Sequence, residues 1–384
     1  MNIETLEQKV FGSKSRFALN SSQKKELIKD LKNSNILIIG AAGSIGKIFS
    51  KKIIDYKFKS IVFFDKDENG LTDLSRDISL RKNKIKREFI CSDLNVSNLK
   101  KIIQNYKITH LLNFAALKHV RSEENFETLN YLFKTNLASV FEDFRKYNVS
   151  HLKKIFFIST DKTAYPSSVM GCSKKIMENE LYKLKLRFKN KSITTVRFAN
   201  VAFSNGSILK NIYERTLNSE VFGIPLKIKR FFVTHKEAAD LCLISLLKEA
   251  DGNIIIPNPD IFQKQFFIKD IASKIVKVLG KKIIFSKKII NTKNNQQLAL
   301  CSHLQITGQK NQEHFSEQNE KKTKFNGDNR VLKIRLYKNH NNSRLLKKLT
   351  EVKNIDEIKY LLSYTFKKYI AQNKKKIINL KDII

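Results

Sequence analysis

The chain has 384 residues, of which 41% are hydrophobic, and this content supports a sizeable core and excludes an intrinsically disordered protein. The formal net charge of +37 indicates either an anionic partner (nucleic acid, an anionic membrane surface or a phosphorylated small substrate) or a compositional bias that scatters lysines over solvated faces. Because the lysines are spread along the chain, the compositional explanation is favoured, and we expect no specific nucleic-acid binding.

The cysteines and the apolar runs give expectations about the compartment. Four cysteines stand far apart without a CxxC pair, namely Cys91, Cys172, Cys242 and Cys301, so we expect neither a disulfide framework nor a metal site. The first residues contain no apolar signal-peptide core, and no apolar run approaches the roughly 18 residues of a membrane span. We expect a cytoplasmic protein without a membrane span.

Strand-like and helix-like segments alternate along the first 200 residues. A polar lead-in and one helix over 21–33, capped by Ser21 or Ser22, precede the first strand. Buried strands are predicted at 35–40, 61–65, 87–93, 110–116, 154–160 and 193–199, and helices at 44–56, 68–78, 123–147 and 168–188. This alternation predicts an α/β fold with a doubly wound parallel sheet, the Rossmann type that binds dinucleotides.

The composition suggests four regions. Residues 1–34 form an N-terminal helical lead-in, and 35–200 form the dinucleotide-binding domain. Residues 201–345 form a smaller substrate-binding region interleaved with the sheet, although 281–345 show too little periodicity for an assignment of elements. Residues 346–384 form a C-terminal tail with an amphipathic helix over 355–370.

A glycine-rich turn links the first strand to the following helix. Gly40, Gly43 and Gly46, with Ser44 and Ile45 between them, permit a close approach of the backbone to a pyrophosphate at the helix N-terminus. The motif alone also fits an ordinary turn. Asp65 ends the second strand 19 residues beyond Gly46, which matches the position of a ribose-binding acid and favours NAD over NADP.

Two further positions bear on the cofactor. Lys66 would soften the repulsion between Asp65 and a 2′-phosphate. Asp93 and Leu94 follow the third strand and are expected near an adenine, although a strand-end turn explains Asp93 equally simply.

Polar residues follow the fifth strand, where ligands bind in such sheets. Thr160, Asp161 and Lys162 end that strand, and Met170 and Lys174 share one face of the next helix at a spacing of four. A lysine there can bind the nicotinamide ribose and lower the pKa of a neighbouring hydroxyl. Taken singly, each residue is also explained as a cap, a packing residue or a solvated charge.

These motifs together resemble the extended short-chain dehydrogenase/reductases, and within them the UDP-N-acetylglucosamine 4,6-dehydratases of polysaccharide biosynthesis. The matching stretches over about residues 35–245 are IIGAAGSIGK, NFAALKHVRSEE, ISTDKTAYPSSVMGCSKKIMEN, VRFANVAFSNGS and KRFFVTHKEA. Farther on, TGQKNQEHF (307–315) resembles a TGEKxYEE segment that helps close the substrate site.

The chain departs from the family pattern at two positions. Met170 replaces the usual tyrosine of YxxxK, as in a subgroup of these dehydratases, and Gln309 replaces a glutamate. Met170 cannot act as a base, and Tyr165 lies in the loop before the helix, so we do not expect it to substitute. The group that deprotonates the sugar C4 hydroxyl stays open.

The resemblance implies conversion of UDP-N-acetylglucosamine, or a GDP-linked equivalent, to a 4-keto-6-deoxy sugar by internal NAD-mediated redox and loss of water. It makes Asp161 the general acid at C6 and Lys162 the C5 base, with Thr160 on the C4 oxygen. Lys162 would have to be neutral, so we expect burial or Lys174 to lower its pKa. The family also implies a homo-oligomer.

The remaining ligand positions follow from the same resemblance. The cofactor is expected to contact Ala115, Ala116, Lys118, Asn136 and Lys174, and the nucleotide sugar is expected to contact Lys118, His119, Asn200, Ser207 and Arg230. One alternative is a 4-epimerase or reductase of the same superfamily. Another is a non-catalytic NAD-binding scaffold that binds polyanions through its positive charge.

Overall fold

The computed structural model describes residues 1–81, 85–119, 123–146, 151–260, 265–302, 313–337, 348–349, 352 and 354–365. Its centre is a nine-stranded sheet with the order β15-β16-β11-β6-β5-β4-β1-β2-β3. The strands are β1 (Asn35–Ile39), β2 (Ser60–Asp65), β3 (Lys86–Cys91), β4 (His110–Asn113), β5 (Lys154–Ile158), β6 (Ser192–Val196), β11 (Asn253–Pro257), β15 (Lys322–Phe325) and β16 (Asp328–Arg335). All pair in parallel except the β15–β16 hairpin, which joins β11 antiparallel. The predicted doubly wound fold is confirmed.

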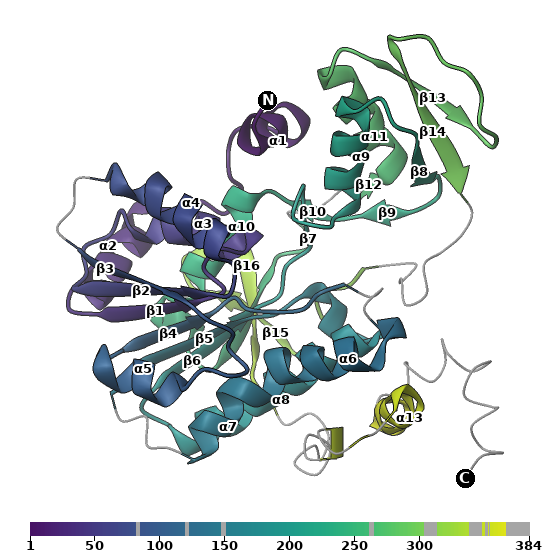
Figure 1. Ribbon diagram of the computed structural model, residues 1–384. Helices are drawn as coiled ribbons and strands as arrows, with labels where there is room; N and C mark the ends of the chain where they lie inside the picture. Colours follow the sequence, from purple (N-terminus) through teal and green to yellow (C-terminus); the bar gives the residue numbers. More distant parts are fainter. Residues whose placement is uncertain are drawn as a thin grey trace.

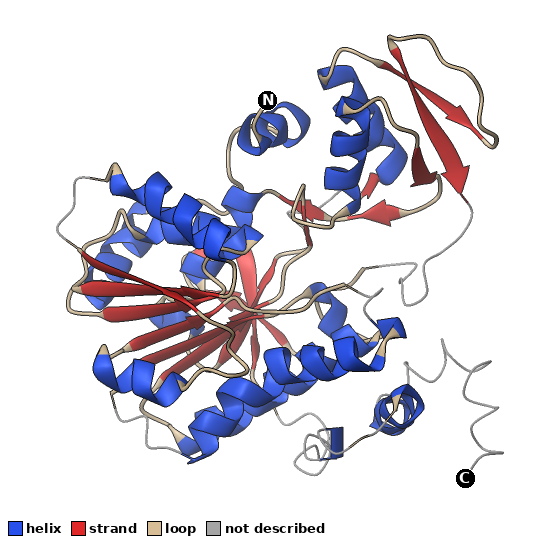
Figure 2. Cartoon of the chain, in the orientation of Figure 1, coloured by secondary structure: helices blue, strands red, loops and turns tan. Residues whose placement is uncertain are grey.

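Helices cover both faces of this sheet (Figures 1 and 2). One face carries α3 (Ser44–Ile53), α4 (Glu68–Ser79) and α10 (His235–Ile244), and the other carries α5 (Leu99–Asn105), α6 (Phe126–Phe133), α7 (Ser139–Lys146) and α8 (Val169–Arg187). Because both faces are covered, β1 and β5 are buried along their whole length, as continuous apolar runs require.

The helix predicted over 123–147 is interrupted. A π-helical segment, Lys134–Ala138, lies between α6 and α7. A π segment inserts an extra residue into the helical repeat and is frequent at functional sites, and periodicity alone does not locate it. Asn136, a predicted cofactor contact, lies inside this segment.

A smaller unit packs beside the carboxyl ends of the strands. It contains α1 (Ile3–Phe11), α9 (Ile208–Leu217), α11 (Ile268–Val278) and a three-stranded sheet of β8 (Phe222–Pro225), β13 (Lys282–Ser286) and β14 (Gln296–Ser302). Two short pairs, β7 (Asn200–Val201) with β10 (Phe232–Val233) and β9 (Lys229–Arg230) with β12 (Phe266–Phe267), lie between the two units (Figure 1). The smaller unit has its own apolar core, which includes Leu6, Ile212, Phe222 and Ile271.

Residues 281–345, which the sequence left unassigned, supply β13 and β14 to the smaller unit and the β15–β16 hairpin to the large sheet. β11 also returns to the large sheet. After residue 200 the chain therefore leaves the large sheet for the smaller unit twice and returns to the large sheet each time. In the described part of the chain, no helix is both long and apolar enough to cross a bilayer.

The two chain ends differ from the prediction. Residues 1–34 form two helices, α1 and α2 (Ser21–Leu31), instead of one. The N-cap of α2 is Asn20 and not Ser21 or Ser22, because Asn20 and Gln23 form a reciprocal capping box. The C-terminal helix is described over α13 (Ile355–Thr365), and the rest of the predicted 355–370 helix lies outside the described residues.

Candidate functional site

The glycine turn brings three chain segments into close backbone contact. Gly40 has φ +80°, and a Cβ there would lie 2.5 Å from the Ala115 nitrogen. A Cβ on Gly46 would lie 2.0 Å from the Gly40 carbonyl oxygen, so this position also excludes a side chain. Helix α3 begins at Ser44 with Gly43 as its N-cap and has no side-chain cap. Its first N–H groups are therefore suited to an anion such as a pyrophosphate.

Asp65 lies at the end of β2 beside this turn. Its Oδ2 accepts a hydrogen bond from the Ala42 nitrogen at 2.8 Å, and its Oδ1 accepts one from the Asp67 nitrogen at 3.1 Å. The carboxylate thus joins the glycine turn to the start of α4. Each oxygen has a second lone pair that can accept a ribose hydroxyl.

Tyr131 of α6 links two predicted cofactor residues and was missed in the sequence, since a tyrosine on an apolar helix face carries no particular signal. Its hydroxyl donates to Asp93 Oδ2 at 2.5 Å and accepts from Lys66 Nζ at 3.1 Å. Partial burial raises the pKa of Asp93, but the bonds from Tyr131 and Asn95 outweigh burial and lower it. Leu94, next to Asp93, is buried in the core.

The loop after β4 is held by Asn136. The Asn136 side chain accepts from the Leu117 nitrogen at 3.0 Å and donates to the Leu117 carbonyl at 3.1 Å and to Ser173 Oγ at 3.1 Å. This fixes the backbone at Ala115 and Ala116 next to Gly40. Asn136 thus positions the loop, and the turn, the uncapped helix and the Asp65 carboxylate together fit a dinucleotide.

The residues after β5 form a polar cluster. Asp161 is 2% exposed, its Oδ1 accepts from Thr160 Oγ1 at 2.9 Å, and Lys162 Nζ lies 3.3 Å from the same oxygen. The expectation of a lowered pKa for Lys162 is wrong in this state. Burial lowers it, but the nearby carboxylates of Asp161 and Glu313 outweigh burial, so that the pKa of Lys162 is raised.

Lys174 does not take part in that cluster. Its ammonium donates to the Ile158 carbonyl at 3.1 Å, and burial lowers its pKa to about 8. Lys174 lies buried on α8. Met170, one turn earlier on the same helix, packs in the core. The Met170 nitrogen donates to the Glu123 carboxylate at 3.0 Å. Burial raises the pKa of Glu123, and these backbone bonds oppose the rise.

Glu313 is the functional candidate that the sequence interpretation missed. Its Oε1 accepts from Asn200 Nδ2 at 2.7 Å and lies 3.2 Å from Arg230 Nε, while its Oε2 accepts from the Phe231 nitrogen at 2.9 Å. Asn200 Oδ1 accepts in turn from Lys162 Nζ at 3.4 Å. A continuous polar chain therefore runs from Asp161 through Lys162, Asn200 and Glu313 to Arg230.

Glu313 lies within the TGQKNQEHF stretch (307–315), in which the departure from the family pattern is Gln309. Gln309 lies outside the described residues. Burial and the charge of Asp161 raise the pKa of Glu313 to about 7, against the lowering influence of Lys162 and Arg230.

The remaining substrate candidates lie on the loop after β4 and at the start of α9. Lys118 Nζ donates to Ser204 Oγ at 3.3 Å, and burial together with the charges of Lys162 and Lys210 lowers its pKa to about 8. The His119 ring packs against Gly206, where a Cβ would lie 2.4 Å from the imidazole. Ser207 is the N-cap of α9, accepting from the Lys210 nitrogen at 3.3 Å.

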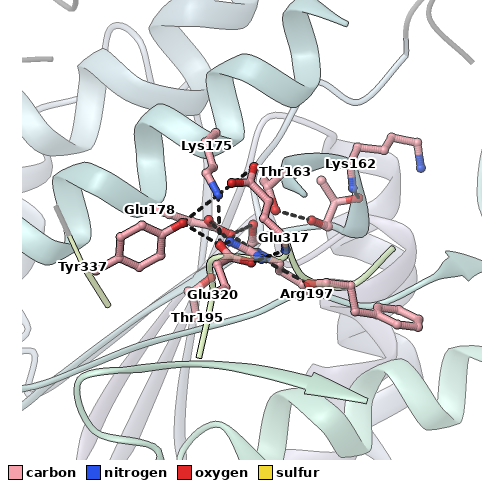
Figure 3. Close-up of polar contacts among 12 residues, drawn as sticks. Lys162, Thr163, Lys175, Glu178, Thr195, Arg197, Glu317, Glu320 and Tyr337 are labelled. Carbon is pink, nitrogen blue, oxygen red and sulfur yellow. Dashed lines mark hydrogen bonds and ion pairs between the residues drawn. The ribbon is translucent and has the colours of Figure 1, made fainter. Parts of the chain in front are cut away.

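A buried ion cluster lies beside the turn that carries Lys162 (Figure 3). Arg197, fully buried after β6, pairs with Glu178 of α8 at 2.6 Å and with Glu320 at 2.7 Å. Lys175 lies 3.3 Å from Glu317 and 3.0 Å from Glu320, and the Tyr337 hydroxyl donates to Glu320 at 2.7 Å. These contacts hold the segment 313–320 against the sheet.

Tyr165 adds to the contacts that hold the segment 313–320 in place. It has φ +51°, its nitrogen donates to Glu317 Oε1 at 3.0 Å, and its hydroxyl accepts from the Gln318 nitrogen at 2.6 Å. Tyr165 therefore holds the 313–320 segment. That Tyr165 does not replace the tyrosine missing at Met170 stays a prediction.

Comparison with known proteins adds the family. Polysaccharide biosynthesis proteins, as a family, match residues 36–334. The capsular polysaccharide biosynthesis protein CapD of Staphylococcus aureus is 26% identical over 261 residues, which are 66% of this chain and only 42% of that protein. The UDP-glucose 4-epimerase of Rickettsia bellii is 26% identical over 362 residues, covering 86% of this chain and 95% of that protein.

Solved structures share the fold. The UDP-N-acetylglucosamine 4-epimerase from Methanobrevibacter ruminantium M1, in complex with UDP-N-acetylmuramic acid, superposes with a TM-score of 0.57 at 17% identity, over 89% of this chain and 99% of that one. The dTDP-glucose 4,6-dehydratase from Bacillus anthracis, in complex with NAD, gives a TM-score of 0.54 at 18% identity, over 70% and 85%. The chain belongs to the polysaccharide biosynthesis protein family of extended short-chain dehydrogenase/reductases, whose relatives modify nucleotide sugars.

Proposed function

We propose that this protein is a nucleotide-sugar 4,6-dehydratase that acts on UDP-N-acetylglucosamine. The observation that carries the proposal is the Asp161–Lys162 pair, an acid and a potential base 3.3 Å apart at the carboxyl end of β5. Loss of water from C5 and C6 needs two groups with opposed proton duties. The position of the tyrosine that serves C4 chemistry in the superfamily is held by Met170, which packs in the core.

NAD is the proposed cofactor, and the B. anthracis dehydratase and its complex support this choice. Gly40, Gly43 and Gly46 with the start of α3 would hold the pyrophosphate, and Asp65 would accept from the ribose hydroxyls. The chemistry that the cofactor supplies when bound is reversible hydride transfer with the sugar. A ribose hydroxyl beside Asp65 is preferred to a 2′-phosphate, because two anions repel.

Lys162 and Asp161 must both be uncharged to act as base and acid in the proposed roles. Their ion pair can supply that state. Transfer of one proton from the Lys162 ammonium to the Asp161 carboxylate gives a neutral amine and a neutral acid, with no net change of charge. Exclusion of water by a bound sugar favours this neutral pair, because desolvation penalises both charged forms. Lys162 can then remove the C5 proton, and Asp161 can protonate the departing C6 hydroxyl.

The substrate's diphosphate would bind among the cations that line the same site. Arg230 offers a planar guanidinium suited to phosphate, and Lys162 lies near enough to interact electrostatically with both Arg230 and Lys118. Asn200 bridges Lys162 and Glu313 and is placed to contact the sugar. His119 and Ser207 shape the wall without donating a charge of their own.

A 4-epimerase is the second candidate, favoured by the epimerase names of several relatives. Both activities share the fold and the cofactor, so the proton-handling residues must decide. Both reactions oxidise C4 and must remove the proton of its hydroxyl, so Met170 in place of the tyrosine bears on both alike. Only the dehydratase also requires a group that protonates a leaving C6 hydroxyl, the role proposed for Asp161.

The direct test is incubation of the protein with NAD and UDP-N-acetylglucosamine, followed by mass spectrometry of the nucleotide sugars. We expect a product lighter by one water. An isobaric product with the N-acetylgalactosamine configuration would instead establish the epimerase.

A further inference from the structure

The guanidinium of Arg230, which the proposed function assigns to the diphosphate, is engaged by a carboxylate in the ligand-free protein. Arg230 Nε lies 3.2 Å from Glu313 Oε1, and the two side chains are only 11% and 6% exposed. A further bond, from Arg230 to the Lys229 carbonyl at 2.9 Å, orients the guanidinium. Glu313 thus already pairs with the positive charge that a bound diphosphate would need.

Glu313 is placed there by contacts that do not involve Arg230. Asn200 Nδ2 and the Phe231 nitrogen bind its two oxygens at 2.7 and 2.9 Å. The ion cluster around Arg197 and Glu320 anchors the following residues to the sheet. The carboxyl group is therefore fixed in position and cannot leave without rearranging the segment.

Two anions fixed around one guanidinium in a dry site repel each other strongly. A buried carboxylate that cannot move away relieves this repulsion by binding a proton. We propose that Glu313 takes up a proton when a nucleoside diphosphate-sugar engages Arg230, so that substrate binding and Glu313 protonation are coupled. This inference rests on the proposed function, because it requires Arg230 to bind the diphosphate.

The charges around Glu313 set the pH range of the coupling. Asp161 and Lys162 face it from the end of β5, and Arg230 faces it from β9. Lys118, on the loop after β4, lies close enough to Lys162 for the charge of Lys162 to lower the pKa of Lys118. In the ligand-free protein burial and the charge of Asp161 raise the pKa of Glu313 to about 7, against the opposing charges of Lys162 and Arg230, so its carboxyl group titrates in the neutral range.

The coupling has a consequence for Lys162. Ionised Glu313 is one of the two carboxylates that keep Lys162 protonated. Once Glu313 is neutral, only Asp161 opposes the loss of the Lys162 proton, and the pKa of Lys162 falls. Glu313 therefore acts as a positioning residue: its additional protonation on substrate binding favours removal of the C5 proton by Lys162.

Calorimetry measures this coupling without turnover. The protein is loaded with NADH, which cannot accept a hydride, and titrated with UDP-N-acetylglucosamine in buffers of different ionisation enthalpy. This substrate carries no group of its own that titrates near pH 7. We expect an uptake of about 0.3–0.5 proton at pH 7, and an affinity that falls about threefold to tenfold as the pH rises from 6 to 8.5.

Variants assign the proton. Glu313→Gln is isosteric and should abolish both the proton uptake and the pH dependence of affinity, and it should bind at least as tightly as the wild type at pH 8.5. Glu249→Gln is the control, since Glu249 is paired with Lys333 at the opposite end of the strands, and its titrations should match the wild type.

The outcomes separate the two proposals. Binding of UDP-N-acetylglucosamine without proton uptake, or uptake that persists in Glu313→Gln, overturns the coupling and leaves the dehydratase proposal standing. If NADH-loaded wild type binds no UDP-sugar at any pH, the proposed function fails first. A 13C-carboxyl resonance that titrates near pH 7 and disappears in Glu313→Gln would still locate the titrating group in that case, and its absence would remove the basis of the inference.

Discussion

The ammonium of Lys162 lies 3.3 Å from the carboxylate of Asp161, its neighbour in the sequence. The two side chains come from one short turn, so their mutual distance is set locally, whereas the pKa of Lys162 depends also on a residue far away in the chain. Glu313 in particular reaches this pair from a segment about 150 residues later. The proposed chemistry depends both on the short distance between Asp161 and Lys162 and on the approach of Glu313.

The roles of this pair can be separated by substitution. Asp161→Asn keeps the shape and removes the transferable proton, so water loss should fall by about 10²–10⁴-fold. Removal of the Asp161 charge also lowers the pKa of Lys162, which should therefore still exchange the C5 proton with deuterated solvent. Lys162→Met should lose this exchange as well. Mass spectrometry and proton NMR of the sugar follow both events.

The assignment fails if Asp161→Asn loses water at the wild-type rate. It also fails if Asp161→Asn abolishes C5 exchange while Lys162→Met retains it. Both variants should still reduce bound NAD when substrate is added, and this reduction serves as the internal control for folding and binding.

Asp65 should set the cofactor preference. We expect the wild type to bind NAD more tightly than NADP, and Asp65→Ala should narrow that difference because the repulsion of a 2′-phosphate disappears. Asp65 also bonds to the nitrogens of Ala42 and Asp67, so Asp65→Asn, which keeps one acceptor, is the milder companion variant. Fluorescence titration gives both dissociation constants. A wild type that binds NADP tenfold better, about 1.4 kcal/mol, would refute this role.

Alanine substitutions at two glycines of the same turn should have very different effects on NAD binding. A Cβ on Gly46 would lie 2.0 Å from a backbone oxygen, so Gly46→Ala must displace the turn and should weaken NAD binding by more than tenfold. A Cβ on Gly43 would lie 3.4 Å from the same oxygen, in ordinary contact, and Gly43→Ala should bind NAD within about threefold of the wild type. A Gly46→Ala variant that binds NAD as tightly as the wild type would show that the tight turn does not control binding.

The buried Arg197 should matter for stability more than any exposed arginine. Arg197→Met leaves the Glu178 and Glu320 carboxylates buried without their shared cation, and this should reduce the free energy of unfolding by about 3–5 kcal/mol. Arg81→Met, at a half-exposed pair with Asp55, should cost less than about 1 kcal/mol. Urea denaturation followed by circular dichroism measures both, and similar midpoints would contradict the structural role of the cluster.

Much of the fold followed from the alternation of apolar strands and amphipathic helices, because parallel strands buried on both faces have a distinctive composition. The hairpin β15–β16 could not be predicted, since its pairing with β11 depends on a partner strand distant in sequence. The capping of α2 by Asn20 was missed because adjacent Asn, Ser and Ser residues are all acceptable caps, and only the reciprocal bond with Gln23 decides.

The candidate site was predictable where motif residues are local, as at Gly40 to Gly46 and at Asp161 with Lys162. It was not predictable where charge depends on distant partners. The pKa of Lys162 rises because Asp161 and Glu313 lie near it, and no spacing in the sequence reports the approach of Glu313. Arg197 was the missed signal, since a charged residue directly after an apolar strand indicates a buried ion pair when no solvent can reach it.

The central claim is an internal redox dehydration, and a substrate labelled with deuterium at C4 tests it most directly. UDP-N-acetylglucosamine carrying deuterium at C4 is incubated with the protein and NAD, and the product is analysed by mass spectrometry and deuterium NMR. We predict a 4-keto product that has lost one water and carries the deuterium in its C6 methyl group. Deuterium that stays at C4, with no water lost, would contradict the account.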